Sequence, residues 1–106
     1  MDLIDPKVEG FADLMTSHPG LLLQEIEQAT YASHAQPHML SGHIQGRVLS
    51  FLSQMQKPKS ILEIGTFTGY SALCLAEGLV EEGELHTLEL REQGARLAQS
   101  YIDGRN

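Results

Sequence analysis

The fold of this chain is decided by the stretch Ser60-Ile-Leu-Glu-Ile-Gly-Thr-Phe-Thr-Gly-Tyr-Ser-Ala-Leu-Cys-Leu-Ala76. Residues 60–64 carry the branched apolar side chains that a strand buried on both faces requires. Gly65 and Gly69 bracket a tight turn, and residues 71–79 continue as a helix. A buried strand, a glycine turn and a helix form the kind of unit that binds nucleotides at the carboxyl end of the strand.

One carboxylate interrupts the apolar strand. Glu63 is costly to bury unless another group binds it. It stands near the carboxyl end of the strand, beside the glycine turn, where α/β folds bind their ligands. We therefore expect Glu63 to contact a ligand.

The spacing of the turn argues against a dinucleotide. A dinucleotide fingerprint that begins at Gly65 needs a second glycine at position 67 and a glycine or alanine at position 70. Phe67 and Tyr70 stand there instead, and a side chain as large as Phe67 blocks close approach of a pyrophosphate. This disfavours a nicotinamide-dependent dehydrogenase. S-adenosylmethionine, which joins an adenosine to an amino acid without a pyrophosphate, remains compatible.

A second strand is expected over residues 84–90, and Glu89 stands at its end. An acidic residue at this place can accept hydrogen bonds from both ribose hydroxyls. The alternative is that Glu89 is merely a solvated acid at a strand end.

The segment Leu62-Glu-Ile-Gly-Thr-Phe-Thr-Gly-Tyr-Ser71, preceded by His38-Met-Leu-Ser41 and Gly46, resembles the S-adenosylmethionine-dependent O-methyltransferase family that includes the caffeoyl-CoA and catechol enzymes. The resemblance covers roughly Gln36 to Gln99. It implies an α/β fold that is the N-terminal half of a Rossmann-like methyltransferase, with a helical approach region followed by β-α-β-α.

The resemblance also implies the cofactor contacts. The carboxylate of Glu63 and the backbone at positions 65 and 66 face the methionine part in the family, and the acid at 89 binds the ribose. Free N–H groups at the start of the next helix suit the methionine carboxylate. The implied cofactor-binding residues are Ser41, Glu63, Gly65, Thr66, Ser71 and Glu89. No catalytic residue and no metal ligand is assigned.

Members of the family are considerably longer than this chain. We therefore expect residues 1–106 to form a single partial methyltransferase domain, truncated after its first half. Residues 1–56 form the helical approach region and residues 57–106 the cofactor-binding unit. The family implies a divalent metal, Mg²⁺, but its ligands and most of the acceptor pocket belong to the part that this chain lacks.

Two functions remain open. The first is methyl transfer from S-adenosylmethionine to a hydroxyl of a small, catechol-like acceptor. The alternative is a catalytically inactive fragment that acts at most through self-association. A two-stranded sheet leaves its first strand without a neighbour on one side, so we expect a homo-oligomer in either case.

Composition bounds the partners and the compartment. The 106 residues include 7 basic and 14 acidic ones, and the net charge of −7 disfavours nucleic acid and anionic membranes. The single cysteine, Cys74, stands among leucines and is expected to be inert in a reducing compartment. The first residues lack the features of a signal peptide, and no apolar run approaches a membrane span. These features predict a cytoplasmic protein.

Four further helices are predicted from apolar periodicity. One follows Asp5-Pro6 and ends near Ser17, and another covers residues 21–33. A third covers residues 42–55 and is expected to lie against the sheet, and the last covers residues 91–102, with Gly104 beyond its end. Their expected buried faces are Val8, Phe11, Leu14 and Met15; Leu22, Ile26 and Ala29; Ile44, Val48, Leu52 and Met55; and Ala95, Ala98 and Ile102.

Simpler interpretations stay open for several of these residues. The glycine turn also occurs in other α/β proteins, Ser71 also suits a plain helix start, and Ser41 also suits a helix cap. His34, His38 and His43 suggest a metal site, but Pro37 separates the first two and favours solvated loop histidines.

Overall fold

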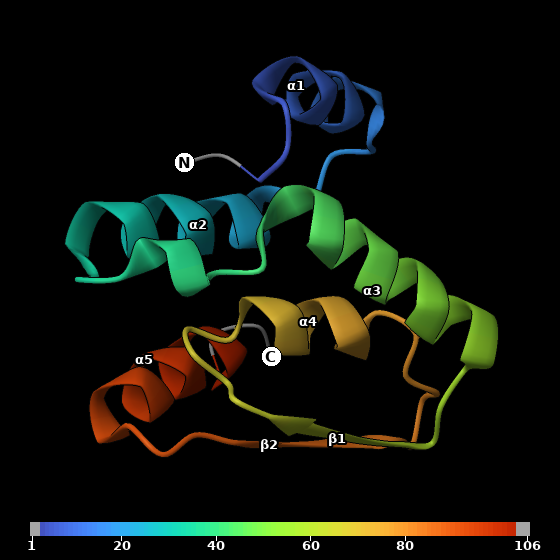
Figure 1. Ribbon diagram of the computed structural model, residues 1–106. Helices are drawn as coiled ribbons and strands as arrows, with labels where there is room; N and C mark the ends of the chain where they lie inside the picture. The colour runs from blue at the N-terminus through green and yellow to red at the C-terminus, as the bar shows by residue number, and fades with distance from the viewer. Residues whose placement is uncertain (1–2, 104–106) are drawn as a thin grey trace.

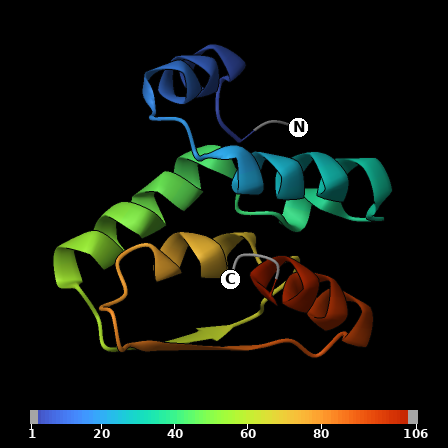
Figure 2. The ribbon, with the colours of Figure 1, turned by 180° about the vertical axis from the view of Figure 1, so that it is seen from behind.

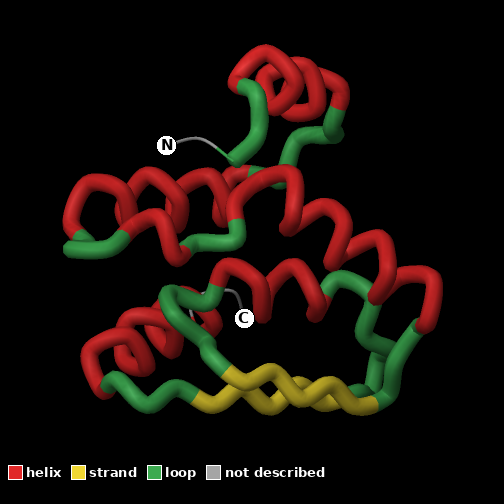
Figure 3. The backbone as a smooth tube through the Cα atoms, in the orientation of Figure 1, coloured by secondary structure: helices red, strands yellow, loops and turns green. Residues whose placement is uncertain are grey.

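The computed structural model describes residues 3–103, and its elements follow the predicted order of helices and then β-α-β-α (Figure 1). Figure 3 shows the same elements as a backbone tube coloured by type. Gly104, expected beyond the last helix, lies outside the described residues. The elements are α1 (Pro6–Met15), α2 (Leu21–Ser33), the short 3₁₀ helix η1 (Pro37–Met39), α3 (Gly42–Gln56), β1 (Ser60–Ile64), α4 (Tyr70–Ala76), β2 (Glu84–Leu88) and α5 (Glu92–Asp103).

The two strands form a parallel sheet, with Glu63 opposite Thr87 and Ile64 opposite Leu88. The described helices all lie on one side of this sheet (Figures 1 and 2). A parallel pair needs a crossover connection, which α4 supplies here. The carboxyl ends of both strands therefore meet at one edge, next to the glycine turn.

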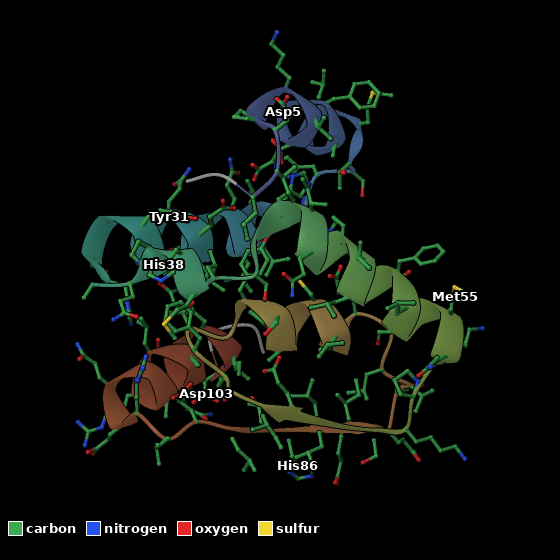
Figure 4. All side chains as sticks on the ribbon, viewed as in Figure 1. Asp5, Tyr31, His38, Met55, His86 and Asp103 are labelled. Atoms are coloured by element: carbon green, nitrogen blue, oxygen red, sulfur yellow. The ribbon has the colours of Figure 1, made fainter. Side chains whose placement is uncertain are left out.

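The prediction that the first strand is buried on both faces is wrong for the described residues. Ile61 and Glu63 turn toward the helices and are half-buried, whereas Leu62 and Ile64 are 66% and 80% exposed on the other face. His86, the register partner of Leu62, also points away from the helices (Figure 4). The apolar run reflects a strand built for two covered faces, of which the described residues cover one.

The core lies between α2, η1 and α4. Its buried apolar residues are Leu23, Ile26, Leu40, Tyr70, Leu73 and Cys74. Burial raises the pKa of the Cys74 thiol to about 11, so this thiol is protonated at neutral pH.

The prediction that α3 lies against the sheet is wrong, because α3 packs on α4 instead (Figure 1). Its buried positions are small residues, Gly46, Ser50 and Ser53. A Cβ added at Gly46 would lie 2.7 Å from a ring carbon of Tyr70, so the two helices approach closely only because this residue is a glycine. The expected face of Ile44, Val48, Leu52 and Met55 is turned outward, and Met55 is 68% exposed.

The other helices match their predicted ranges more closely than their predicted faces. The side chain of Asp5 accepts a hydrogen bond of 2.9 Å from the Lys7 backbone, which confirms the predicted cap of α1. The stripe of Val8, Phe11, Leu14 and Met15 is exposed rather than buried. In α2 the buried face is Leu23, Ile26 and Thr30, and in α5 the buried residue is Ala98, as expected. Among residues 3–103, none of the helices is long and apolar enough to cross a membrane.

Candidate functional site

The glycine turn between β1 and α4 adopts a backbone that requires left-handed residues. Gly65 and Gly69 have φ values of 95° and 93°. Phe67 also lies in the left-handed region, at 51°, which is uncommon for a bulky residue and marks local strain. Such strain persists only where neighbouring groups hold the backbone.

The end of β2 supplies those neighbouring groups. The backbone N–H of Gly65 donates to the carbonyl of Leu88 at 2.8 Å. The hydroxyls of Thr66 and Thr87 lie 2.5 Å apart. The N–H of Phe67 donates to Glu89 Oε1 at 2.7 Å. Three consecutive residues of the turn are therefore fixed by the second strand and the residue after it.

Both carboxylate oxygens of Glu63 have protein partners. Ser71 Oγ donates to Oε2 at 2.6 Å, and Thr87 Oγ1 donates to Oε1 at 2.8 Å. These bonds offset the cost of placing a half-buried charge behind the turn. Each oxygen of a carboxylate has a further lone pair, so the group can still accept from a ligand.

A small pocket brings four of the six predicted residues together, and we call it the turn pocket. Ser41 does not cap α3 with its side chain, which argues against its plain structural interpretation. The pocket has a volume of about 60 Å³. This volume is about that of two water molecules, so it can hold one end of a ligand and no more. It is lined by Met39, Leu40, Ser41, Gly65, Thr66, Phe67, Tyr70 and Ser71.

Glu89 lies on the other side of Phe67, in a pocket of about 450 Å³ that we call the outer pocket. The backbone N–H groups of Arg91 and Phe67 lower the pKa of the Glu89 carboxyl, so it is ionised at neutral pH. Phe67 lines both pockets, which therefore adjoin. The edge of His34 packs on the Phe67 ring, with ring centroids 4.6 Å apart.

The three histidines that suggested a metal site lie apart. His34 contacts Phe67, and His43 binds Asp13 and the carbonyl of Ser17. His38 is exposed on η1 (Figure 4). Within residues 3–103, no group of three His, Cys, Asp or Glu side chains is placed to hold a metal ion. The residues described here therefore do not fit the divalent metal that the resemblance implies.

Thr87 is the site residue that sequence reasoning missed. It bonds Glu63 and Thr66 at once. The one signal in the sequence is indirect, because strand alternation places Thr87 and Glu89 on the same face of the second strand. Nothing local to residue 87 indicates that Glu63 is its register partner.

The family model described as O-methyltransferase matches residues 14–105. The chain belongs to this family. A catechol O-methyltransferase of Niastella koreensis is 44% identical over 59 residues, which cover 56% of this chain and 27% of that protein. A caffeoyl-CoA O-methyltransferase of Stellaria longipes is 31% identical over 80 residues, or 76% of this chain and 33% of that protein. The chain thus spans about a third or less of these curated relatives.

Solved structures of O-methyltransferases share the fold. The Podospora anserina methyltransferase PaMTH1, bound to S-adenosylhomocysteine (SAH), matches 99% of this chain and 48% of its own, with a TM-score of 0.86 and 26% identity. The O-methyltransferase from Bacillus cereus in complex with SAH matches 92% of this chain and 44% of its own, with a TM-score of 0.81 and 35% identity. The expected α/β fold, half of a Rossmann-like methyltransferase, is confirmed.

Proposed function

We propose that this chain binds S-adenosylmethionine and forms the donor side of an O-methyltransferase. The acceptor in this proposal is a hydroxyl group of a small, catechol-like molecule. The observation that carries the proposal is the convergence of Ser41, Gly65, Thr66 and Ser71 on one pocket, next to Glu63. Titles of related solved structures name the same cofactor or its product, SAH, as the bound ligand.

The chemistry of the two pockets suits the two ends of this cofactor. The carboxylate of Glu63 can accept from an ammonium group, and the turn pocket is large enough for the amino-acid end alone. Beyond Phe67, Glu89 is ionised and can accept from the ribose hydroxyls, and the outer pocket offers the larger volume. We therefore assign the amino-acid end to Glu63 and the ribose to Glu89.

In the proposed reaction the acceptor oxygen attacks the methyl group of the sulfonium in line. The new C–O bond forms as the S–C bond breaks, the cofactor leaves as a neutral thioether, and the acceptor loses its hydroxyl proton. Fixing the donor in place is a large part of such catalysis, because it replaces a random encounter by one geometry. We assign this chain the holding of the donor, and no step on the acceptor.

The wider setting is part of the proposal. One domain covers residues 1–106, with the approach region at 1–56 and the cofactor-binding unit at 57–106. The net charge of −7 supports a small-molecule acceptor over nucleic acid or an anionic membrane, and a cytoplasmic location agrees with it.

Calorimetric titration with SAH tests the proposal, and NAD⁺ serves as the control ligand. We expect saturable binding of SAH and none of NAD⁺, because Phe67 stands where a pyrophosphate needs a glycine. Titration with SAH that shows no saturation contradicts the proposal. We further expect no Mg²⁺-dependent methylation of catechol by this chain alone, and turnover above a heat-killed control would show that expectation to be wrong.

The alternative is an inactive chain that acts through self-association. The exposed face of the sheet favours it, since Leu62, Ile64 and Leu88 are all more than half exposed there. The same titration separates the two functions, because an inactive fragment associates without binding SAH.

A further inference from the structure

Four polar side chains form a connected set behind the glycine turn. Ser71 on α4 donates to Glu63 on β1, and Thr87 on β2 donates to the other oxygen of Glu63. The hydroxyl of Thr66, in the turn, lies 2.5 Å from that of Thr87. Thr87 is therefore the residue that joins the carboxylate of the first strand to the turn.

The direction of these hydrogen bonds follows from the donor inventory. A carboxylate only accepts, so the single proton of the Thr87 hydroxyl is directed to Glu63. Thr87 must then accept from Thr66 in the short contact between their hydroxyls. The hydroxyl proton of Thr66 is engaged within the protein, and its backbone is the part left to face a ligand.

The two bonds to Glu63 come from two different elements. Ser71 holds Oε2 from the helix, and Thr87 holds Oε1 from the neighbouring strand, in register with Glu63. Two anchored oxygens fix the plane of the carboxylate. With one anchor removed, the group can rotate about the other, and binding a ligand must then also order the side chain.

We propose that Thr87 is a positioning residue, which orients the Glu63 carboxylate toward the ammonium group of the bound cofactor. This inference rests on the proposed function. Thr87 itself touches no ligand in this assignment. It acts through Glu63 and, by way of Thr66, through the turn.

Calorimetry with two ligands and three variants tests the role of Thr87. SAH carries the ammonium group, whereas 5′-methylthioadenosine has the same nucleoside and no amino-acid end. Thr87→Val keeps the shape and branching of the side chain and removes both hydrogen bonds. Thr87→Ser keeps the hydroxyl. Ser53→Ala is the matched control, since it removes a buried hydroxyl that bonds the carbonyl of Leu75, away from both pockets.

We expect Thr87→Val to weaken SAH binding roughly tenfold, the loss typical of one hydrogen bond to a charged group, and to leave 5′-methylthioadenosine binding unchanged. Thr87→Ser is expected to restore SAH binding to within about threefold of the original chain, and Ser53→Ala to leave both ligands unaffected. Circular dichroism checks the fold, and Thr87→Ala replaces the valine variant if that one does not fold.

Unchanged SAH binding in Thr87→Val overturns the positioning role. An equal loss for both ligands overturns it as well, because a purely structural defect does not distinguish the amino-acid end. If the unaltered chain itself does not bind SAH, the proposed function fails first, which is a result distinct from either of these.

Discussion

Glu89 Oε1 accepts a hydrogen bond of 2.7 Å from the backbone N–H of Phe67, the residue with a φ of 51°. Its second oxygen accepts from the N–H of Arg91 at 2.9 Å. One carboxylate thus holds the strained point of the glycine turn and the start of the segment that leads into α5. Its ionised form has lone pairs left for a ligand, so in our proposal Glu89 shapes the turn and binds the ribose.

The first prediction concerns Glu89→Ala. This change removes the partner of Phe67 and the proposed ribose contact together, so SAH affinity is expected to fall by roughly 1–3 kcal/mol. Calorimetry measures the loss, and Glu81→Ala, at an exposed residue of the turn before β2, serves as the control. An affinity equal to that of the unaltered chain would remove Glu89 from the site.

The second prediction concerns the contact between α3 and α4. A Cβ at Gly46 would lie 2.7 Å from Tyr70 and 2.9 Å from Cys74 Sγ, so Gly46→Ala must displace buried side chains. We expect a loss of about 1–3 kcal/mol in the free energy of unfolding, measured by urea denaturation.

Gly10→Ala is the matched control for Gly46→Ala. Gly10 also lies inside a helix, but no atom lies within 4 Å of its added Cβ. There the better helix propensity of alanine is expected to raise stability by up to about 1 kcal/mol. Equal effects of the two changes would show that the close approach of α3 and α4 does not depend on Gly46.

The sequence predicts best what is local. The turn after Ile64 and the cap at Asp5 follow from glycine spacing and from the Asp-Pro pair, and the structure has both. The gathering of Ser41 with the turn comes from the family resemblance, since Ser41 and Gly65 share no local pattern.

What the sequence did not predict depends on distant partners. Apolar periodicity placed Val48 and Leu52 in the interior, yet the closely packed side of α3 consists of glycine and serines, because small residues let two helices approach. The role of Thr87 depends on the register of β1 with β2, and no residue near position 87 encodes it.

The third prediction is a pH dependence that originates at His43. Its Nδ1 lies 2.7 Å from Asp13 Oδ1 and its Nε2 lies 2.5 Å from the carbonyl of Ser17. A neutral imidazole has one N–H and cannot donate to both, so this geometry favours the protonated ring. The carbonyl of Ser17 is the main cause that raises the pKa of His43 above 6.5, and Asp13 and Glu27 add to it.

A raised folded-state pKa means that this stabilisation is complete below the unfolded value and is lost as pH rises through the folded value. We expect the original chain to lose thermal stability between about pH 6 and pH 8 relative to His43→Gln, whose side chain does not titrate. Melting temperatures of both chains over this range measure the difference. Parallel pH profiles for the two chains would show that His43 is not the origin.

The last prediction is self-association through the exposed side and edge of β1. This strand pairs with β2 alone among the described residues, and its outer face exposes Leu62 and Ile64 beside Leu88. A two-stranded sheet is marginal by itself, and an open edge is a template for pairing with a second copy. Light scattering is therefore expected to give a mass above the 11.7 kDa of one chain at high concentration.

A pair of lysine substitutions locates the contact. Ile64→Lys places a charge on the outer face of the sheet and is expected to shift the chain toward the monomer, because an edge strand that carries lysine resists pairing. Leu14→Lys is the control, since Leu14 on α1 is 81% exposed and Ile64 is 80% exposed. If Leu14→Lys disperses the assembly and Ile64→Lys does not, the contact lies on the helices instead. A compact monomer of the unaltered chain that unfolds cooperatively at high concentration would contradict self-association altogether.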